Sequence, residues 1–349
     1  MKEDLIKRYG KNPVLKANPQ NDWENHCVLN PAVIYDDENE RFVMLYRAAG
    51  NDVKHVIRLG LATSEDGFTF TRCSDKPVFD CDENDADGGC VEDPRLMKID
   101  GAYFLTYAAR AYAPGRYWLP YDEYVKQGYE IEKQCECQPA FLRTNHTVTY
   151  LATTCDFHRF KRLGRITDSR YDDRDVYLFD RKVNGKYVKI SRTKYNDGSV
   201  KMPSIYISFS DDIVEWGEQT LLLTGREWWE TARIGGACPP IYTDRGWFML
   251  YHGVDDQGTY RVGAVILDKD DPRKVLARTK NYLFEPEAEY ERVGLYNCCV
   301  FPTANILRGD TLYIYYGCAD KYVSVATADF EALFDSVLYG AAEKTAAAR

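Results

Sequence analysis

One type of strand recurs five times along this chain, and this repeat restricts the possible folds more than any other feature. Each copy is rich in aromatic and aliphatic residues and follows a polar turn such as Asn184-Gly185, as the second strand of a hairpin would. The five copies occupy residues 41–47, 102–108, 186–192, 246–252 and 311–317. A second strand follows each copy and ends in a turn rich in serine, threonine or aspartate. The chain therefore consists of five equivalent units.

The spacing of these units predicts the fold class. The ends of the repeated strands are separated by 61, 84, 60 and 65 residues, which is about the period of a four-stranded propeller blade. Blades that close into a ring leave no long exposed edge, whereas an open sheet of about twenty strands would. We therefore predict an all-β fold, a five-bladed β-propeller in which residues 1–340 form one catalytic domain. Residues 12–15 are expected to close the last blade or lie across it, and residues 341–349 to form a flexible tail.

The second unit is larger than the others, so we predict an insertion in the second blade at about residues 112–141. This segment contains five tyrosines and one tryptophan between residues 112 and 129, and residues 123–129 have a helix-like pattern. Such a segment suits a lid over a substrate. It equally suits a loop that packs against the blades or contacts another subunit, and the sequence leaves both alternatives open.

Composition limits the classes of partner. The 45 basic and 54 acidic residues give a formal net charge of −9 without a long basic run, which disfavours nucleic acid. No apolar stretch of about 18 residues and no apolar leader is evident, so we expect no membrane partner and a cytoplasmic location, although a trimmed leader would look the same. The eleven cysteines are scattered without zinc-site spacing, and we expect free, mostly buried thiols.

A candidate site lies in residues 88–96, where Glu92, Asp93 and Arg95 occupy a glycine-led, proline-stiffened turn before a strand. We interpret Asp93 as the acid of a sugar-cleaving site; the alternative is that Asp93-Pro94 is only a turn. Polar residues also recur where the repeated strands end, and in a propeller these positions converge on the axis. They are Arg47, Arg192, His252 and, just beyond the last strand, Asp320.

Several motifs carry a resemblance to a known family. They are NPAV (30–33), GCVEDPR (89–95), RDVYLF (174–179), KVNGKY (182–187), GGACPP (235–240), LYHGV (250–254) and YYGCAD (315–320). In this order, through all five units, they resemble glycoside hydrolase family 130, the inverting β-mannoside phosphorylases and related β-mannosidases. The resemblance implies a five-bladed propeller, in agreement with the repeat.

The resemblance also implies roles for individual residues. Asp93 matches the proton donor, which acts indirectly through the 3-hydroxyl of the mannosyl unit. Asp320 matches a residue that holds mannosyl hydroxyls, with Asn30, Arg47 and Arg58 as weaker candidates for that subsite. The residues that match the phosphate-binding set are Arg174, Arg192, His252 and Tyr260, with Arg233 where the family's lysine is expected. An arginine there keeps the charge and alters the geometry.

We therefore predict inverting phosphorolysis of a β-mannoside, of the manno-oligosaccharide or mannosyl-glucose type, by inorganic phosphate, which releases α-mannose 1-phosphate. No metal or organic cofactor is expected, and assembly into a homo-oligomer is left open. One alternative is an inverting β-mannosidase in which Glu227 or Glu230 activates water. Another is a noncatalytic carbohydrate-binding propeller.

Overall fold

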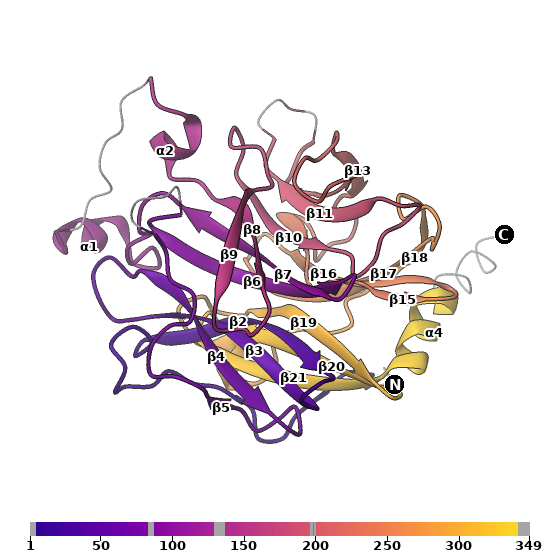
Figure 1. Cartoon of the computed structure of the whole chain (residues 1–349), viewed down its shortest axis with the longest axis horizontal. Helices are drawn as coiled ribbons and strands as arrows, with labels where there is room; N and C mark the ends of the chain where they lie inside the picture. The colour runs from indigo at the N-terminus through magenta and orange to yellow at the C-terminus, as the bar shows by residue number, and fades with distance from the viewer. Residues whose placement is uncertain (1–4, 83–86, 129–136, 196–197, 199, 341–349) are drawn as a thin grey trace.

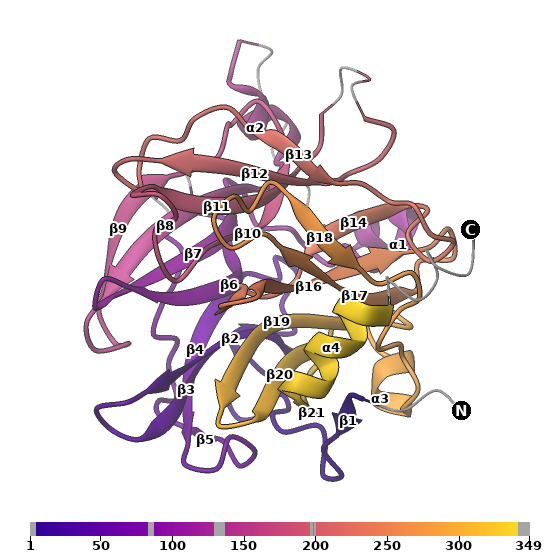
Figure 2. The ribbon, with the colours of Figure 1, turned by 90° about the vertical axis from the view of Figure 1, so that its right-hand side faces the viewer.

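The structure is a computed structural model that describes residues 5–82, 87–128, 137–195, 198 and 200–340. It contains five antiparallel sheets arranged as the blades of a propeller (Figures 1 and 2), which confirms the predicted fold class. Among the described residues, no helix is both long and apolar enough to span a membrane.

In blades 1, 2 and 3 neighbouring strands pair in chain order, and the first strand of each of these blades lies at the hub. Blade 1 contains β2 (Cys27–Asp36), β3 (Arg41–Ala49), β4 (Ile57–Ser64) and β5 (Thr71–Arg72). Blade 2 contains β6 (Cys90–Ile99), β7 (Ala102–Arg110), β8 (Val148–Thr154) and β9 (Phe160–Arg165). Blade 3 contains β10 (Asp173–Leu178), β11 (Tyr187–Thr193), β12 (Ile205–Ser210) and β13 (Thr220–Leu223). Blade 4 contains β14 (Arg233–Gly236), β15 (Ile241–Thr243), β16 (Gly246–Val254), β17 (Tyr260–Leu267) and β18 (Val275–Arg278).

Blade 5 combines both ends of the chain. It contains β19 (Val300–Arg308), β20 (Thr311–Cys318), β21 (Tyr322–Asp329) and, as its outermost strand, β1 (Lys7–Arg8). Leu15 also bridges to Val323, and the Asn12 side chain exchanges two hydrogen bonds of 2.8 and 3.0 Å with the backbone of Val325. The opening segment therefore closes the last blade and lies across it, as predicted.

The repeat seen in the sequence corresponds to the second and third strands of each blade. The third strands end in the same turn in blades 1, 2 and 3, where a hydroxyl accepts a hydrogen bond from the backbone N–H three residues later. The accepting side chains are Ser64, Thr154 and Ser210. Such side-chain bonds satisfy the backbone where the ladder stops.

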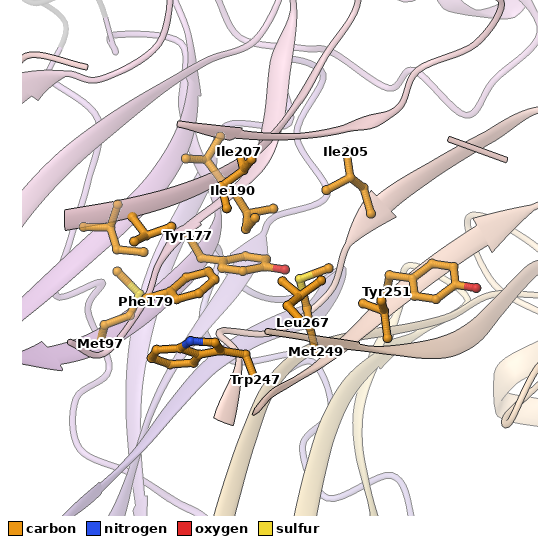
Figure 3. Close-up of a cluster of buried hydrophobic side chains, with 14 of the residues drawn as sticks. Met97, Tyr177, Phe179, Ile190, Ile205, Ile207, Trp247, Met249, Tyr251 and Leu267 are labelled. Atoms are coloured by element: carbon orange, nitrogen blue, oxygen red, sulfur yellow. The ribbon is translucent and has the colours of Figure 1, made fainter. Parts of the chain in front are cut away.

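Large apolar side chains fill the space between blades. In the cluster of Figure 3, Tyr177 and Phe179 of blade 3 face Trp247 and Met249 of blade 4, and blade 2 adds Met97. The ring centroids of Phe179 and Trp247 are 4.5 Å apart. Burying both faces of each sheet in this way holds the blades together and fixes the inner strands around the axis.

Four short helices complete the described structure. The segment between β7 and β8 holds α1 (Tyr121–Lys126), which stands away from the blades (Figure 1), and α2 (Ala140–Thr144), whose Phe141 packs into the core of blade 2. Residues 129–136 of this segment lie outside the described residues, as does the predicted tail 341–349. The others are α3 (Glu289–Arg292) and α4 (Phe330–Gly340), and α4 packs on β17, β18 and β21. The buried residues of α4, Phe330, Leu333, Phe334 and Val337, recur at helical spacing.

Apart from Cys137, the cysteines that the structure describes are free, as expected. Five of the ten described cysteines are buried and three are exposed, so fewer are buried than the sequence suggested. Within the described part of the chain, no group of three or more histidine, cysteine, aspartate or glutamate side chains could hold a metal ion.

Candidate active site

A cavity of about 310 Å³ lies at the hub, where the innermost strands begin, and all five blades contribute to it. A cavity of this size can enclose most of a small ligand. Its lining is polar and charged, with a few aromatic rings. The lining residues are Asn30, Arg47, Glu92, Asp93, Arg110, Pro114, Tyr117, Arg174, Asp175, Arg192, His252, Tyr260, Tyr296, Cys299, Phe301 and Asp320.

The same backbone device places a polar side chain in the cavity from each of blades 1, 2 and 3. The innermost strand of each blade has a register shift there, and the residues at the shifts, Asn30, Asp93 and Asp175, have positive φ angles of 42°, 51° and 54°. A bulge turns a side chain away from the regular alternation of the strand, and asparagine and aspartate tolerate this backbone region better than most residues. The bulges therefore aim three polar groups at the hub.

Asp93 is held by side chains of blade 1. Its Oδ1 accepts hydrogen bonds from Asn30 Nδ2 and Arg47 Nη1, both at 2.8 Å, and the same Nη1 lies 2.9 Å from Glu92 Oε2. Burial would raise the pKa of Asp93, but the charges of Arg47 and Arg95 and the Asn30 amide outweigh burial and hold the pKa below its ordinary value. Asp93 is therefore a carboxylate at neutral pH in this structure.

Asp320 faces the same charges from the turn between β20 and β21. Burial is the main cause that raises its pKa to about 6; Arg47 lowers the pKa, and the carboxylates of Asp93 and Glu92 raise it. The carboxyl groups of Asp93 and Asp320 are therefore electrostatically coupled, and this pair can hold a proton at mildly acid pH.

Arg95 fixes the bulge that carries Asp93. Its guanidinium is completely buried, and Nη1 donates to the carbonyl oxygens of Asp93 at 3.0 Å and Pro94 at 3.2 Å. Its Nε donates at 2.8 Å to the carbonyl of Ala237. Because Ala237 directly follows β14, this one side chain ties the bulge of blade 2 to blade 4 across the hub.

Blade 3 supplies two arginines. Arg174 makes a bidentate pair with Asp172, with both nitrogen–oxygen distances at 2.8 Å, so its plane is fixed. Arg192 Nε lies 3.1 Å from Asp175 Oδ2. Lys194 Nζ adds a further cation 3.9 Å from Asp172 Oδ1.

Blade 4 adds a neutral imidazole and a third arginine. Burial and the nearby charges of Arg192 and Arg233 lower the pKa of His252 well below its ordinary value, so its ring is uncharged. Neither ring nitrogen has a hydrogen-bond partner among the described residues. The ring of Tyr260 stacks on His252 at 5.4 Å, and Arg233 Nη2 donates to Tyr260 Oη at 2.7 Å.

A glycine makes room for this arrangement. A Cβ on Gly235 would lie 2.2 Å from Asp175 Oδ2 and 2.4 Å from Cε1 of His252, so any larger residue would displace both groups. The close approach of Asp175 and His252 therefore explains the glycine at position 235 of the GGACPP motif.

The structure brings together nine of the ten residues predicted for the site. Eight of them line the cavity, namely Asn30, Arg47, Asp93, Arg174, Arg192, His252, Tyr260 and Asp320. Arg233 reaches the lining through its bond to Tyr260.

Arg58 is the exception. It is paired with Ala48 on β3 rather than with Arg47, so its side chain leaves the sheet on the other face from Arg47. Its Nε lies 2.9 Å from Asp80 Oδ1, and it does not line the cavity. The suggestion that Arg58 contributes to the mannosyl subsite is therefore not supported by the geometry.

The two glutamates considered as bases for hydrolysis also lie outside the cavity lining. Glu230 is fully buried, accepts a 2.7 Å hydrogen bond from Tyr251 Oη and pairs with Arg278 at 2.8 Å. Its Oε2 also accepts from the backbone N–H of Glu227 at 3.1 Å. Glu230 thus holds blade 4 together.

Sequence reasoning missed several lining residues. They are Arg110, Pro114, Tyr117, Asp175, Tyr296, Cys299 and Phe301. A signal existed for Asp175, since it follows Arg174 within one of the motifs and occupies the same place in its blade as Asp93 in blade 2. Arg110 ends β7 and Phe301 lies on β19, whereas Pro114, Tyr117, Tyr296 and Cys299 lie in loops.

Comparison with known proteins identifies the family. The sequence profile of glycoside hydrolase family 130, described as beta-1,4-mannooligosaccharide phosphorylase, matches residues 3–121 and 141–338. The chain belongs to glycoside hydrolase family 130. The unmatched residues 122–140 of this family 130 enzyme fall within the insertion of its second blade.

Named relatives of this family 130 enzyme are phosphorylases. A 1,2-β-oligomannan phosphorylase of Thermoanaerobacter sp. (strain X514) is 37% identical over 92% of this chain and 96% of its own length. The β-1,4-mannooligosaccharide phosphorylase of Ruminococcus albus is 31% identical over 96% of this chain and 91% of its own length. Among solved structures, β-1,2-mannobiose phosphorylase from Listeria innocua in complex with β-1,2-mannobiose has a TM-score of 0.75 and 25% identity, with coverage of 95% of this chain and 99% of that one.

Proposed function

We propose that this enzyme cleaves a β-mannoside by inverting phosphorolysis and releases α-mannose 1-phosphate and an acceptor sugar. The observation that carries the proposal is the division of charge within one cavity, with an acid on one side and a cationic pocket on the other. The activities named for the relatives, on β-1,2- and β-1,4-linked mannosides, support the same substrate class.

The charge differs between the two halves of the cavity. The lining residues of blades 5, 1 and 2 include two arginines and three carboxylates, namely Arg47, Arg110, Glu92, Asp93 and Asp320. Blades 3 and 4 place Arg174 and Arg192 at the lining and Arg233 and Lys194 behind it. The carboxylates beside these four cations are Asp175, at the lining, and Asp172, which pairs with Arg174. An excess of cations beside a neutral imidazole suits a phosphate dianion, which needs several fixed donors.

In the proposed reaction a phosphate oxygen forms a bond to the anomeric carbon as the bond to the leaving oxygen breaks on the opposite face. Asp93 supplies the proton that the leaving oxygen takes up, through the mannosyl 3-hydroxyl as the family resemblance implies. Hydrogen phosphate gives up one proton when its oxygen becomes the ester oxygen, so the proton balance closes and Asp93 returns to its starting state. Phosphate thus replaces the base and water of an inverting hydrolase.

The site geometry disfavours the hydrolytic alternative. A hydrolase needs a carboxylate that activates water on the cationic side, and Glu227 and Glu230 do not line the cavity. Asp175 does line it, but it is 5% exposed and lies against Arg192 and His252 at 3.1 and 3.7 Å. In this position the carboxylate of Asp175 orients the guanidinium of Arg192.

Product analysis with and without phosphate tests the proposal. The enzyme is incubated with β-1,2- and β-1,4-mannobiose and longer mannosides, and anomeric products are followed by NMR. We expect α-mannose 1-phosphate only when phosphate is present, and no turnover by Asp93→Asn. Free mannose at the same rate without phosphate would establish a mannosidase instead. Sugar binding without turnover under all conditions would establish a noncatalytic propeller.

A further inference from the structure

A short segment of the second-blade insertion crosses to blade 1 and forms part of the cavity wall. This strap, residues 113–118, is anchored at two points on the loop between β3 and β4. The backbone N–H of Gly115 donates to the carbonyl of Lys54 at 2.8 Å. The Arg116 guanidinium donates to the carbonyl of Asn51 at 2.9 Å and to that of Asp52 at 3.3 Å.

The end of the strap is seated on aromatic rings. Trp118 stacks on His26, with ring centroids 5.1 Å apart, and its edge meets His55 at 4.6 Å. Burial and the charge of Arg47 lower the pKa of His55 to about 3, so this support stays neutral across the physiological range. The support is therefore independent of pH near neutrality.

The turn of the strap depends on a glycine. Gly115 has φ of 67°, and a Cβ there would lie 2.6 Å from the ring of Tyr124 on α1. The backbone angle and the nearby ring both disfavour a side chain at this position. The strap and α1 are therefore packed against each other where Gly115 meets Tyr124.

Tyr117, between these anchors, points its hydroxyl into the cavity. The hydroxyl accepts a 3.4 Å hydrogen bond from Arg47 Nη2, the guanidinium that also holds Asp93. Burial of the hydroxyl end and the charge of Asp320 raise its pKa well above the ordinary value, so it remains a protonated phenol. The residue as a whole is 45% exposed, so it reaches from the mannosyl end of the cavity to the surrounding solvent.

We propose that Tyr117 is a specificity-determining residue, held by the strap so that its ring contacts the acceptor sugar next to the bond that is cleaved. This inference rests on the phosphorolysis proposed above. Its hydroxyl lies against Arg47, on the side where the mannosyl unit would bind, and its exposed part faces the route by which the acceptor enters and leaves. Aromatic faces bind the apolar face of a sugar ring while polar edges remain available for hydrogen bonds.

The experiment compares Tyr117→Ala and Tyr117→Phe with wild type in reverse synthesis from α-mannose 1-phosphate against a panel of acceptor sugars. We expect Tyr117→Ala to raise KM for the preferred acceptor by about tenfold, the size of one aromatic contact, and to change the ranking of acceptors. Tyr117→Phe keeps the ring and should keep the ranking. In all variants KM for phosphate should remain within about twofold of wild type, because Tyr117 lies on the other side of the cavity from Arg174, Arg192 and Arg233.

Two further variants separate specificity from general damage. Tyr121→Ala removes a ring that is 78% exposed on α1 and does not line the cavity, so it should leave the acceptor ranking unchanged. Trp118→Ala loosens the strap with Tyr117 intact and should shift acceptor KM in the same direction as Tyr117→Ala. An unchanged acceptor KM and ranking in Tyr117→Ala, or equal losses for phosphate and acceptor, would overturn the proposal.

The same assay tests the phosphorolysis proposal separately from the role of Tyr117. Wild-type enzyme that forms no α-mannose 1-phosphate in the same assay would refute phosphorolysis. In that case calorimetric titration with β-mannobiose still decides the role of Tyr117. Equal affinity of wild type and Tyr117→Ala would refute it, and about tenfold weaker binding by the variant would support contact with the sugar.

Discussion

Replacing Arg95 by methionine removes a side chain that ties the Asp93 bulge to blade 4. Methionine has a similar length and fills most of the space, so the change is chiefly the loss of donors. Three carbonyl oxygens, those of Asp93, Pro94 and Ala237, lose their guanidinium partner. Each buried acceptor left without a donor costs about 1–3 kcal/mol, while removing a buried charge recovers part of that cost.

We therefore expect a net destabilisation of about 2–5 kcal/mol, which lowers the melting temperature by roughly 3–7 °C for a chain of this length. Differential scanning calorimetry measures this change, with Arg95→Lys as a control that keeps the charge but loses the fork. A melting temperature equal to that of wild type would show that the bulge is held by its own strand.

The same variant has a second readout that a purely structural role would not produce. The charge of Arg95 helps to hold the pKa of Asp93 below its ordinary value, so its removal raises that pKa. If Asp93 is the proton donor, the limb of the kcat/KM profile on which activity falls with rising pH should move to higher pH. Arg95→Lys should move it less. A pH profile of Arg95→Met that coincides with wild type would refute the electrostatic part of the reasoning.

Three further substitutions test separate parts of the site. Arg233→Met should raise KM for phosphate at least tenfold and leave KM for the mannoside nearly unchanged, as measured by initial rates at varied phosphate. Glu230→Gln breaks a buried pair with Arg278 and should destabilise the fold by about 3–5 kcal/mol, seen in melting curves, whereas a water-activating role would change catalysis alone. Arg58→Ala should leave both KM values within about twofold, because Arg58 pairs with Asp80 outside the cavity; a rise in mannoside KM would contradict this placement.

The blade repeat was predictable because it rests on local chemistry. Alternating apolar residues and polar turns mark the second and third strands of each blade, and their number fixes the number of blades. The innermost strands were harder to recognise. In β14 the ladder stops before Pro239 and Pro240, which lack backbone donors, and pairing resumes only at β15.

Site residues could be predicted where a sequence motif lies on an inner strand at the hub. They could not be predicted where contacts between distant parts of the chain bring a side chain to the cavity. Asp93 and His252 were found from motifs and repeated strand ends. The bulge that aims Asp175 depends on pairing between strands, and Tyr117 reaches the cavity only because its strap binds the loop of blade 1. Arg58 was misplaced because the resemblance gave its position along the chain and not the face of the sheet from which it projects.

The electrostatic coupling between Asp93 and Asp320 leads to a further prediction about when Asp93 takes up its proton. Asp93 is ionised in this structure, yet the proposed reaction requires it to give a proton. Its Oδ1 already accepts two hydrogen bonds, so the proton would be carried on Oδ2. An anion bound by Arg174 and Arg192 adds negative charge to the same cavity. This charge raises the pKa of Asp93 and that of Asp320, which is already about 6.

Anion binding should therefore be accompanied by proton uptake. Sulfate is a suitable probe because it remains a dianion between pH 6 and 8, whereas phosphate itself titrates in this range. Calorimetric titration at about pH 6.5 in buffers with different ionisation enthalpies should show uptake of a fraction of a proton per sulfate. Asp320→Asn should reduce that uptake without abolishing sulfate binding, since the cations remain. A binding enthalpy of wild type that is independent of the buffer would show that the cationic pocket and the acid are not coupled, and the proton would then have to arrive with the sugar.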